Sequence, residues 1–118
     1  KPLNGSKILL LGMAYKKNID DVRESPSFRL LELFNRSGAL VDFHDPHVSG
    51  VSIPGHAQYY KESVPLESGT LRDYDAVVIA TDHTAVDYRL VGEEATLIID
   101  TRNVMHQFLP VRAKVAKA

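Results

Sequence analysis

Four apolar runs along the chain predict the strands of a parallel β-sheet. Residues 7–12 (KILLLG), 75–81 (DAVVIAT) and 95–101 (ATLIIDT) are continuous aliphatic stretches without polar alternation. Such runs are typical of parallel strands that are covered on both faces. Residues 39–45 (ALVDFHD) alternate more between apolar and polar positions, so we expect this strand nearer an edge of the sheet.

The clearest helix is predicted between the strands at 7–12 and 39–45. Ser25 can cap it, Pro26 suits its first position and Gly38 can end it. Its apolar residues form one broad stripe with charged residues opposite. The stripe contains Phe28, Leu30, Leu31, Leu33 and Phe34, and the opposite face contains Arg29, Glu32 and Arg36. The two strands and this helix predict a right-handed βαβ unit.

The rest of the chain has weaker patterns. Residues 82–91 (DHTAVDYRLV) predict a second, shorter helix that Thr84 caps. Residues 47–74 are rich in Gly, Pro and Ser and predict only a short strand within AQYYKESVPL. The tail from Pro110 is compatible with a helix or with a frayed end. The alternation of strands and helices predicts an α/β fold, a Rossmann-like three-layer sandwich with a mostly parallel sheet. A length of 118 residues predicts a single domain over residues 1–118.

Composition excludes several classes of protein. Basic and acidic residues nearly balance at a net charge of −1, which predicts neither a nucleic-acid nor a membrane partner. No apolar stretch approaches the roughly 20 residues that span a bilayer. The chain has no cysteine, so disulfides, zinc–cysteine sites and thiol nucleophiles are excluded, which fits a reducing cytoplasm. It begins without Met, as we expect of a domain excised from a longer protein.

The carboxyl ends of the predicted strands share one edge of the sheet, where ligands bind in folds of this kind. Loops at this edge contribute Lys16, Arg23, Asp82, His83 and Arg102. Basic side chains beside helix N-termini favour anions, so these loops predict a phosphate-bearing ligand. In the alternative interpretation, Arg23 pairs with a nearby aspartate, Asp20 or Asp21, and only pins its loop. Arg102 directly follows the predicted strand at 95–101, which contains LIID, on the side where function is usually placed.

Other kinds of site fit less well. The five histidines include no helical pair at i and i+4, so we expect surface or capping histidines and no metal site. Asp45 and Pro46 predict a strand end and a turn in which the aspartate bonds nearby backbone. A Gly-x-Ser-x-Gly elbow is absent, which argues against a hydrolase. A phospho-acceptor receiver domain would need acidic residues directly at the end of the first strand, and the sequence has none there, which argues against this class.

The loop after the first strand departs from the dinucleotide-binding pattern. The sequence GMAYKKNIDDVRESPS stands where Gly-x-Gly-x-x-Gly would be expected. Without those glycines the backbone cannot approach a pyrophosphate closely, although long cationic side chains can reach one. The loop therefore predicts a domain that closes over a ligand held mostly by other parts of a protein.

Four segments of the chain resemble the carboxy-terminal domain of the UDP-glucose/GDP-mannose dehydrogenase family. They are LGMAYKKNIDDVRESPS, GALVDFHDP, YDAVVIATDH and IIDTRN, which follow the family order from about Lys7 to Asn103. The motifs HDP, TDH and DTRN are most similar to the branch that acts on UDP-N-acetyl-hexosamines.

The resemblance implies an NAD-dependent oxidation of the C6 hydroxyl of a UDP-sugar to a carboxylate. In this family an amino-terminal domain holds NAD, a central helix links two subunits, and the catalytic cysteine lies upstream. The resemblance therefore implies a homo-oligomeric full-length enzyme, of which this chain alone is inactive and binds UDP-sugars weakly. It places Tyr15, Lys16 and Arg102 at the nucleotide sugar and Arg23 at the NAD pyrophosphate. The rival hypothesis is a stand-alone regulatory module that binds a phosphate ligand.

Overall fold

The computed structural model describes residues 5–13, 26–52, 60–67 and 69–117 of the chain. Five strands form the main sheet: β1 (Lys7–Leu11), β2 (Leu40–His44), β5 (Ala76–Ile79), β6 (Leu97–Asp100) and β7 (Lys114–Lys117). Two helices accompany them, α1 (Pro26–Arg36) and α2 (Tyr88–Glu94), together with the 3₁₀ turns η1 (Leu71–Asp73) and η2 (Met105–Phe108). A separate two-stranded sheet consists of β3 (Gly50–Ser52) and β4 (Tyr60–Glu62).

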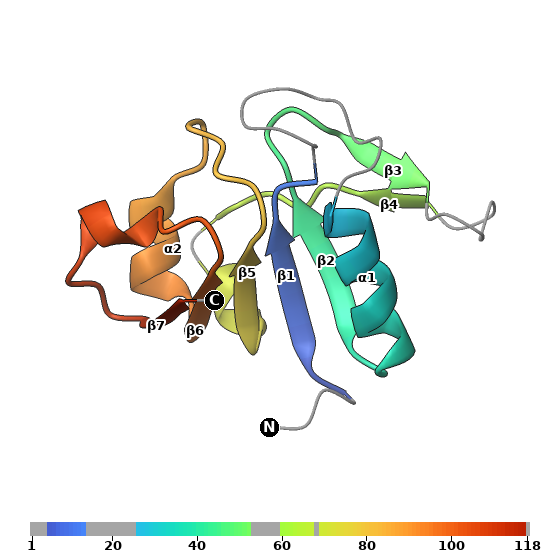
Figure 1. The fold of residues 1–118 in the computed structure, drawn as a ribbon, viewed down its shortest axis with the longest axis horizontal. Helices are drawn as coiled ribbons and strands as arrows, with labels where there is room; N and C mark the ends of the chain where they lie inside the picture. The colour runs from blue at the N-terminus through green and yellow to red at the C-terminus, as the bar shows by residue number, and fades with distance from the viewer. Residues whose placement is uncertain (1–4, 14–25, 53–59, 68, 118) are drawn as a thin grey trace.

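The main sheet has the order β2-β1-β5-β6-β7, and all its neighbours are parallel. Each strand predicted from an apolar run is present, and β2 lies at an edge as expected. The strand β1 lies between β2 and β5, with Leu10 opposite Phe43 on one side and Val78 on the other. All carboxyl ends therefore point to the same edge of the sheet (Figure 1).

Alternate residues of the strands build two apolar cores, one on each face of the sheet. Leu9, Val77 and Ile98 point to the face that α2 covers, where they pack with Val91. Leu10, Phe43 and Val78 point to the opposite face and pack with Leu31 of α1. The two helices lie on opposite sides of the sheet, which confirms the three-layer sandwich (Figure 1).

The helix α1 begins at Pro26, as the sequence predicts, whereas its predicted cap Ser25 lies outside the described residues. At its other end Gly38 has φ +84°, and its amide donates to the Asn35 carbonyl. Gly38 thus ends the helix in the left-handed conformation that favours glycine. The predicted apolar stripe is too wide at one position, because Leu33 is 50% exposed. The sheet covers only the part of the stripe around Leu31.

Two predictions for the second half of the chain are wrong. The second helix begins at Tyr88 instead of near residue 82, and Asp87 caps it by accepting from the Leu90 amide. The residues before it form turns, in which the Val86 amide donates to the His83 carbonyl and the Tyr88 amide to the Val86 carbonyl, and the bond from the Val91 amide to the Asp87 carbonyl is helical. The tail after Pro110 forms the strand β7, neither a helix nor a frayed end. Pairing with β6 supplies its backbone hydrogen bonds, and Val115 adds to the core on the α2 face.

The irregular region between β2 and β5 contains more structure than the sequence predicts. The short strand expected within residues 57–66 is β4, and it pairs with β3 in an antiparallel hairpin that was not predicted. The hairpin is attached to the end of β2, since the Val64 amide donates to the Phe43 carbonyl. In the part of the chain that the structure describes, no helix is long and apolar enough to cross a membrane.

Gly12 is required where β1 ends. Its φ is +98°, and a Cβ placed there would lie 2.5 Å from the Thr81 Cβ and 2.8 Å from the Thr81 nitrogen. The end of β5 thus packs directly on the backbone of Gly12. This glycine provides close strand packing at the position where a dinucleotide-binding turn would begin.

We expect Gly12→Ala to lower the free energy of unfolding by roughly 2–5 kcal/mol, from backbone strain together with the clash with Thr81. Gly5→Ala is the matched control, because Gly5 also has a positive φ (+85°) but nothing lies within 4 Å of the position that a Cβ would take there. Denaturant unfolding of both variants measures the difference. Equal losses in the two variants would contradict a steric role for the contact with β5.

Candidate ligand-binding edge

The candidate site lies at the carboxyl edge of the sheet, where the chain leaves β1, β2, β5 and β6. Tyr15, Lys16 and Arg23, which the sequence places at this edge, lie within residues 14–25, outside the described residues. The remaining predicted site residue, Arg102, directly follows Thr101 at the end of β6. The described part of the site therefore consists of Arg102 and the residues that order the strand ends around it.

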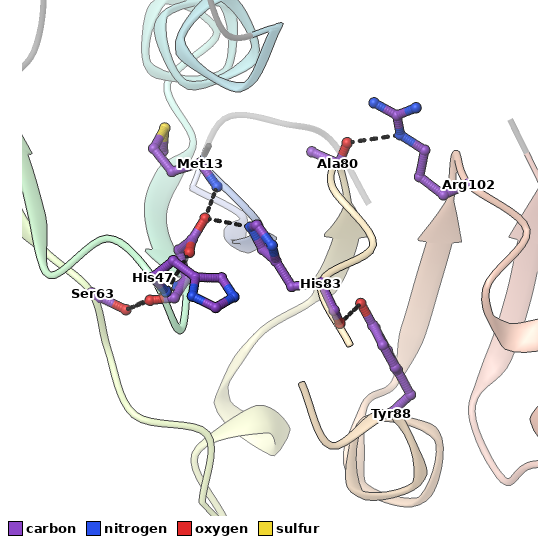
Figure 2. Close-up of polar contacts among 8 residues, drawn as sticks. Met13, His47, Ser63, Ala80, His83, Tyr88 and Arg102 are labelled. Atoms are coloured by element: carbon purple, nitrogen blue, oxygen red, sulfur yellow. Dashed lines mark hydrogen bonds and ion pairs between the residues drawn. The ribbon is translucent and has the colours of Figure 1, made fainter. Parts of the chain in front are cut away.

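Asp45 organises the ends of β1 and β2. One carboxylate oxygen, Oδ2, accepts from the Met13 amide at 2.7 Å, and the other, Oδ1, accepts from the His47 amide at 2.7 Å. The backbone amide of Asp45 donates to the Ser63 hydroxyl at 3.0 Å, which joins this turn to the segment after β4 (Figure 2). The predicted turn in which Asp45 bonds nearby backbone is confirmed. Its bond to Met13, which lies 32 residues away, was not predicted.

His83 contradicts the expectation of surface histidines. Its ring is fully buried, and its Nε2 lies 2.9 Å from Asp45 Oδ2. Because an ionised carboxylate only accepts, Nε2 carries the hydrogen of this bond. The His47 ring contacts the His83 ring edge to face, with 4.8 Å between the ring centroids. No spacing in the sequence reveals this pair, because 38 residues separate Asp45 from His83.

The first βα turn uses its own backbone amides internally. The Gly12 amide donates to the His44 carbonyl at 2.8 Å, and the Met13 amide donates to Asp45. In a dinucleotide-binding turn the backbone at this point approaches the pyrophosphate. The amides of Gly12 and Met13 are already engaged, so this turn does not fit a dinucleotide held in that manner.

A second buried carboxylate, that of Asp100, orders the loop that carries Arg102. Its Oδ1 accepts from the amides of Arg102 and Val104 at 3.0 and 3.2 Å, and its Oδ2 accepts from the Met105 amide at 2.8 Å. The loop passes through Asn103 in the left-handed region, with φ +57°. Asparagine tolerates this conformation better than most residues. Three charge-assisted hydrogen bonds thus fix the backbone of Arg102 and of the residues that follow it.

The guanidinium of Arg102 is anchored at one end. Its Nε donates to the Ala80 carbonyl at 3.1 Å, from the end of β6 to the end of β5 (Figure 2). Its terminal nitrogens make no hydrogen bond or ion pair with the chain over the described ranges. Those nitrogens retain donors in the fork geometry that matches carboxylates and phosphates.

Two hollows flank Arg102, one on each face of the sheet. The first has a volume of about 360 Å³ and lies against α1, between Leu30, Leu33 and Thr101. The second, also of about 360 Å³, lies on the α2 side between Asp82, Tyr88 and Gln107. Arg102 lines both hollows, so an anion at its terminal nitrogens could extend into either.

A further hollow, of about 400 Å³, lies at the other end of α2, where it is lined by Arg72, Glu94 and Arg112 among others. There Arg72 Nε donates to Glu94 Oε2 at 2.7 Å, and Arg72 Nη2 lies 2.5 Å from the same oxygen. This ion pair joins η1 to α2 and lies away from the strand ends that carry Arg102. We therefore assign it to the stability of the fold. Among the described residues, no group of three or more His, Cys, Asp or Glu side chains could hold a metal ion.

The sequence matches the UDP-glucose/GDP-mannose dehydrogenase family, UDP binding domain, over residues 9–107. The chain belongs to this family. A UDP-N-acetyl-D-mannosamine dehydrogenase from Pyrococcus horikoshii is 33% identical over 105 residues, which cover 85% of this chain and 22% of that protein. A UDP-glucose 6-dehydrogenase from Pseudomonas aeruginosa is 35% identical over 113 residues, covering 85% of this chain and 24% of that enzyme.

Comparison with solved structures also finds sugar-nucleotide dehydrogenases. The UDP-D-ManNAc dehydrogenase from Pyrococcus horikoshii superposes with a TM-score of 0.71 at 30% identity, over 99% of this chain and 26% of that one. An NDP-N-acetyl-D-galactosaminuronic acid dehydrogenase from Methanosarcina mazei also has a TM-score of 0.71 and 30% identity, over 99% of this chain and 25% of that one. The chain thus spans about a quarter of the length of its relatives. The expected family, and the likeness to relatives named for N-acetyl-hexosamine substrates, are confirmed.

Tyr88 gives the folding stability a pH dependence. Burial, and then the charges of Asp82, Asp100 and Asp45, raise the pKa of Tyr88 well above its ordinary value of 10.0. An unfolded tyrosine loses its proton near pH 10, whereas the folded Tyr88 retains it. Stability from this group is therefore complete below pH 10 and is lost as the pH rises above it.

We expect Tyr88→Phe to cost about 1 kcal/mol at neutral pH, because its hydroxyl donates to the His83 carbonyl. Above pH 10 the variant should lose stability less steeply than the wild type, by up to about 1.4 kcal/mol per pH unit. Urea unfolding across this pH range measures the difference. Tyr74→Phe is a useful comparison, because burial and Asp42 also raise the pKa of Tyr74. It should likewise lose stability less steeply than the wild type above pH 10. Parallel curves for Tyr88→Phe and the wild type would contradict the assignment.

Proposed function

We propose that this chain is the nucleotide-sugar-binding domain of an NAD-dependent UDP-sugar 6-dehydrogenase. The enzyme would oxidise the C6 hydroxyl of a UDP-hexose or UDP-N-acetyl-hexosamine to a carboxylate. The observation that carries the proposal is the position of Arg102 in a chain of the UDP-binding family. Its guanidinium is anchored to backbone at the carboxyl edge of the sheet and presents its remaining donors between two hollows.

Arg102 would bind the negatively charged part of the nucleotide sugar. Guanidinium groups match phosphate oxygens in geometry, and hydrogen bonds to charged groups contribute roughly 1.5–3 kcal/mol each. Tyr15 and Lys16 would complete this contact from the loop after β1, because the ends of β1 and β6 lie at the same edge. Two or three such bonds, less the cost of association, correspond to millimolar affinity, about −4 kcal/mol. We therefore propose that the domain alone binds UDP-sugars weakly and does not catalyse the reaction.

NAD would be held mainly by another part of the full-length enzyme. The engaged amides of Gly12 and Met13 do not fit a dinucleotide, and the chain has no cysteine for a covalent intermediate. In the proposal Arg23 reaches the NAD pyrophosphate across the cleft between domains when this domain closes. The partners are then the UDP-sugar, NAD and the amino-terminal and central domains of the same chain, in a homo-oligomer.

The direct test is NADH formation by the full-length gene product with UDP-N-acetylglucosamine, UDP-N-acetylmannosamine, UDP-glucose and GDP-mannose offered separately. Arg102→Ala should raise KM for the substrate roughly 10- to 100-fold, as expected for the loss of one charged hydrogen-bonding group. Arg112→Ala is the matched control, since this arginine is also exposed but lies at the hollow beside Glu94. It should leave KM unchanged.

The same assay tests the assignment of Arg23. Arg23→Ala should raise KM for NAD more than KM for the sugar nucleotide, whereas Arg102→Ala should do the reverse. Identical effects of the two variants would contradict the division of roles. No turnover of any of the four substrates by the folded, full-length protein would favour the regulatory module.

A further inference from the structure

Two side chains of opposite charge line the hollow that Arg102 shares with Asp82, Tyr88 and Gln107, the α2-side hollow. Asp82 is half-buried and follows the end of β5. Over the described ranges its carboxylate makes no hydrogen bond or ion pair, not even with Arg102, whose terminal nitrogens also have no partner there. A partly desolvated carboxylate without a partner is unfavourable. Its position in the hollow therefore points to a ligand that donates hydrogen bonds to it.

The two hollows beside Arg102 differ in charge. The α1-side hollow has a second arginine, Arg29, and no acidic residue among the described residues that line it. The helices α1 and α2 lie on opposite sides of the sheet, so the two hollows do too (Figure 1). A phosphate on the α1 side meets two guanidinium groups, whereas one in the α2-side hollow meets the carboxylate of Asp82. These charges favour the diphosphate on the α1 side of Arg102 and an uncharged part of the ligand on the α2 side.

The α2-side hollow suits a group that carries hydroxyls. The ionised carboxylate of Asp82 can only accept hydrogen bonds, so the ligand must supply the donors. Gln107 uses its amide nitrogen to donate to the Val104 carbonyl at 3.3 Å, which leaves its amide oxygen as another acceptor. Val104 and Phe108 add apolar surface to the same hollow. Neighbouring hydroxyls on a ring with apolar C–H groups fit this lining, and dinucleotide-binding folds bind ribose hydroxyls with an acidic side chain in the same way.

A UDP-sugar has hydroxyls on both sides of its diphosphate, on the ribose and on the hexose. The hexose is the end that is oxidised. This chain has no cysteine, and the amides of Gly12 and Met13 do not fit a dinucleotide, so the hexose has to reach other parts of the full-length enzyme. The ribose is the hydroxyl-bearing end that remains for a hollow of this domain.

We propose that Asp82 binds the ribose hydroxyls of the nucleotide in the α2-side hollow, next to the phosphate that Arg102 binds. This subsite rests on the proposed function and deepens it, because it gives the substrate a direction across the edge of the sheet. The nucleoside lies on the α2 side of Arg102 and the diphosphate extends toward the α1 side. The domain then distinguishes a ribonucleotide from a nucleotide that lacks the two hydroxyls.

The test is isothermal titration of the full-length protein with UDP and with 2′,3′-dideoxy-UDP, which lacks both ribose hydroxyls. The wild type should bind UDP at least about 10-fold more tightly, as expected for hydrogen bonds to a charged group. Asp82→Ala should reduce this ratio to about twofold or less, mainly by weakening UDP. The substitution leaves no described group without its partner, since Asp82 has none.

Asp73→Ala is the matched control. Asp73 is an exposed aspartate of η1, which precedes β5 and so lies at the opposite edge of the sheet. This variant should keep the wild-type ratio between the two nucleotides. Arg102→Ala should weaken both nucleotides by the same factor, roughly 10-fold, because both carry the phosphates. A ratio that falls in Arg102→Ala as it does in Asp82→Ala would contradict the separate roles of the two residues.

The outcomes separate this subsite from the proposed function. If the wild type binds UDP and dideoxy-UDP equally, or if Asp82→Ala keeps the wild-type ratio, the subsite is wrong and the proposed function stands. A loss of affinity for NAD instead of UDP in Asp82→Ala would also overturn it, because the ribose in the hollow would then belong to NAD. A folded, full-length wild type that does not bind UDP would reject the proposed function, and the subsite with it.

Discussion

The pairing of β1 on both sides is the constraint on which the rest of the structure depends. A strand with parallel neighbours on both sides must be apolar on both faces, and the run of leucines in β1 satisfies both cores. It also brings the end of β1 into contact with the ends of β2 and β5. A glycine is therefore required at position 12, because Thr81 occupies the space that a side chain would need there. The packing of the sheet thereby fixes the backbone at Gly12, where the chain enters the candidate ligand-binding edge.

Two buried aspartates extend this order from the sheet into the loops. Asp45 and Asp100 each follow or end a strand, and each accepts hydrogen bonds from backbone amides of the loop beyond. Loops at a sheet edge have backbone groups that the ladder does not satisfy, and a carboxylate can satisfy several of them at once. Negative side chains thus hold the backbone of this edge, whereas Arg102 carries the positive charge that the proposed function assigns to the ligand. The aspartates and the arginine therefore have different roles at this edge.

The sequence predicts the fold because most of its information here is local. Aliphatic runs define β1, β5 and β6, and the residues Pro26 and Gly38 delimit α1. The start of the second helix was missed because Thr84 was chosen as its cap and the structure uses Asp87. The strand β7 was missed because it depends on pairing with β6. Arg102 was found from its place after a strand. The bond between Asp45 and His83 was not, because no local pattern encodes a contact across an intervening strand.

Each hydrogen bond that anchors the Arg102 loop joins a side chain of residues 100–102 to a main-chain atom. Arg102 Nε bonds the carbonyl of Ala80, Thr101 Oγ1 donates to the carbonyl of Ile79 at 2.6 Å, and Asp100 accepts from the backbone amides of the loop. Main-chain partners persist when side chains are exchanged. The hollows beside Arg102 could therefore be reshaped over generations, at Leu33 or Gln107 for example, while the arginine keeps its position. Under the proposed function, such a separation would let the preference for one sugar change while recognition of the common phosphate group is preserved.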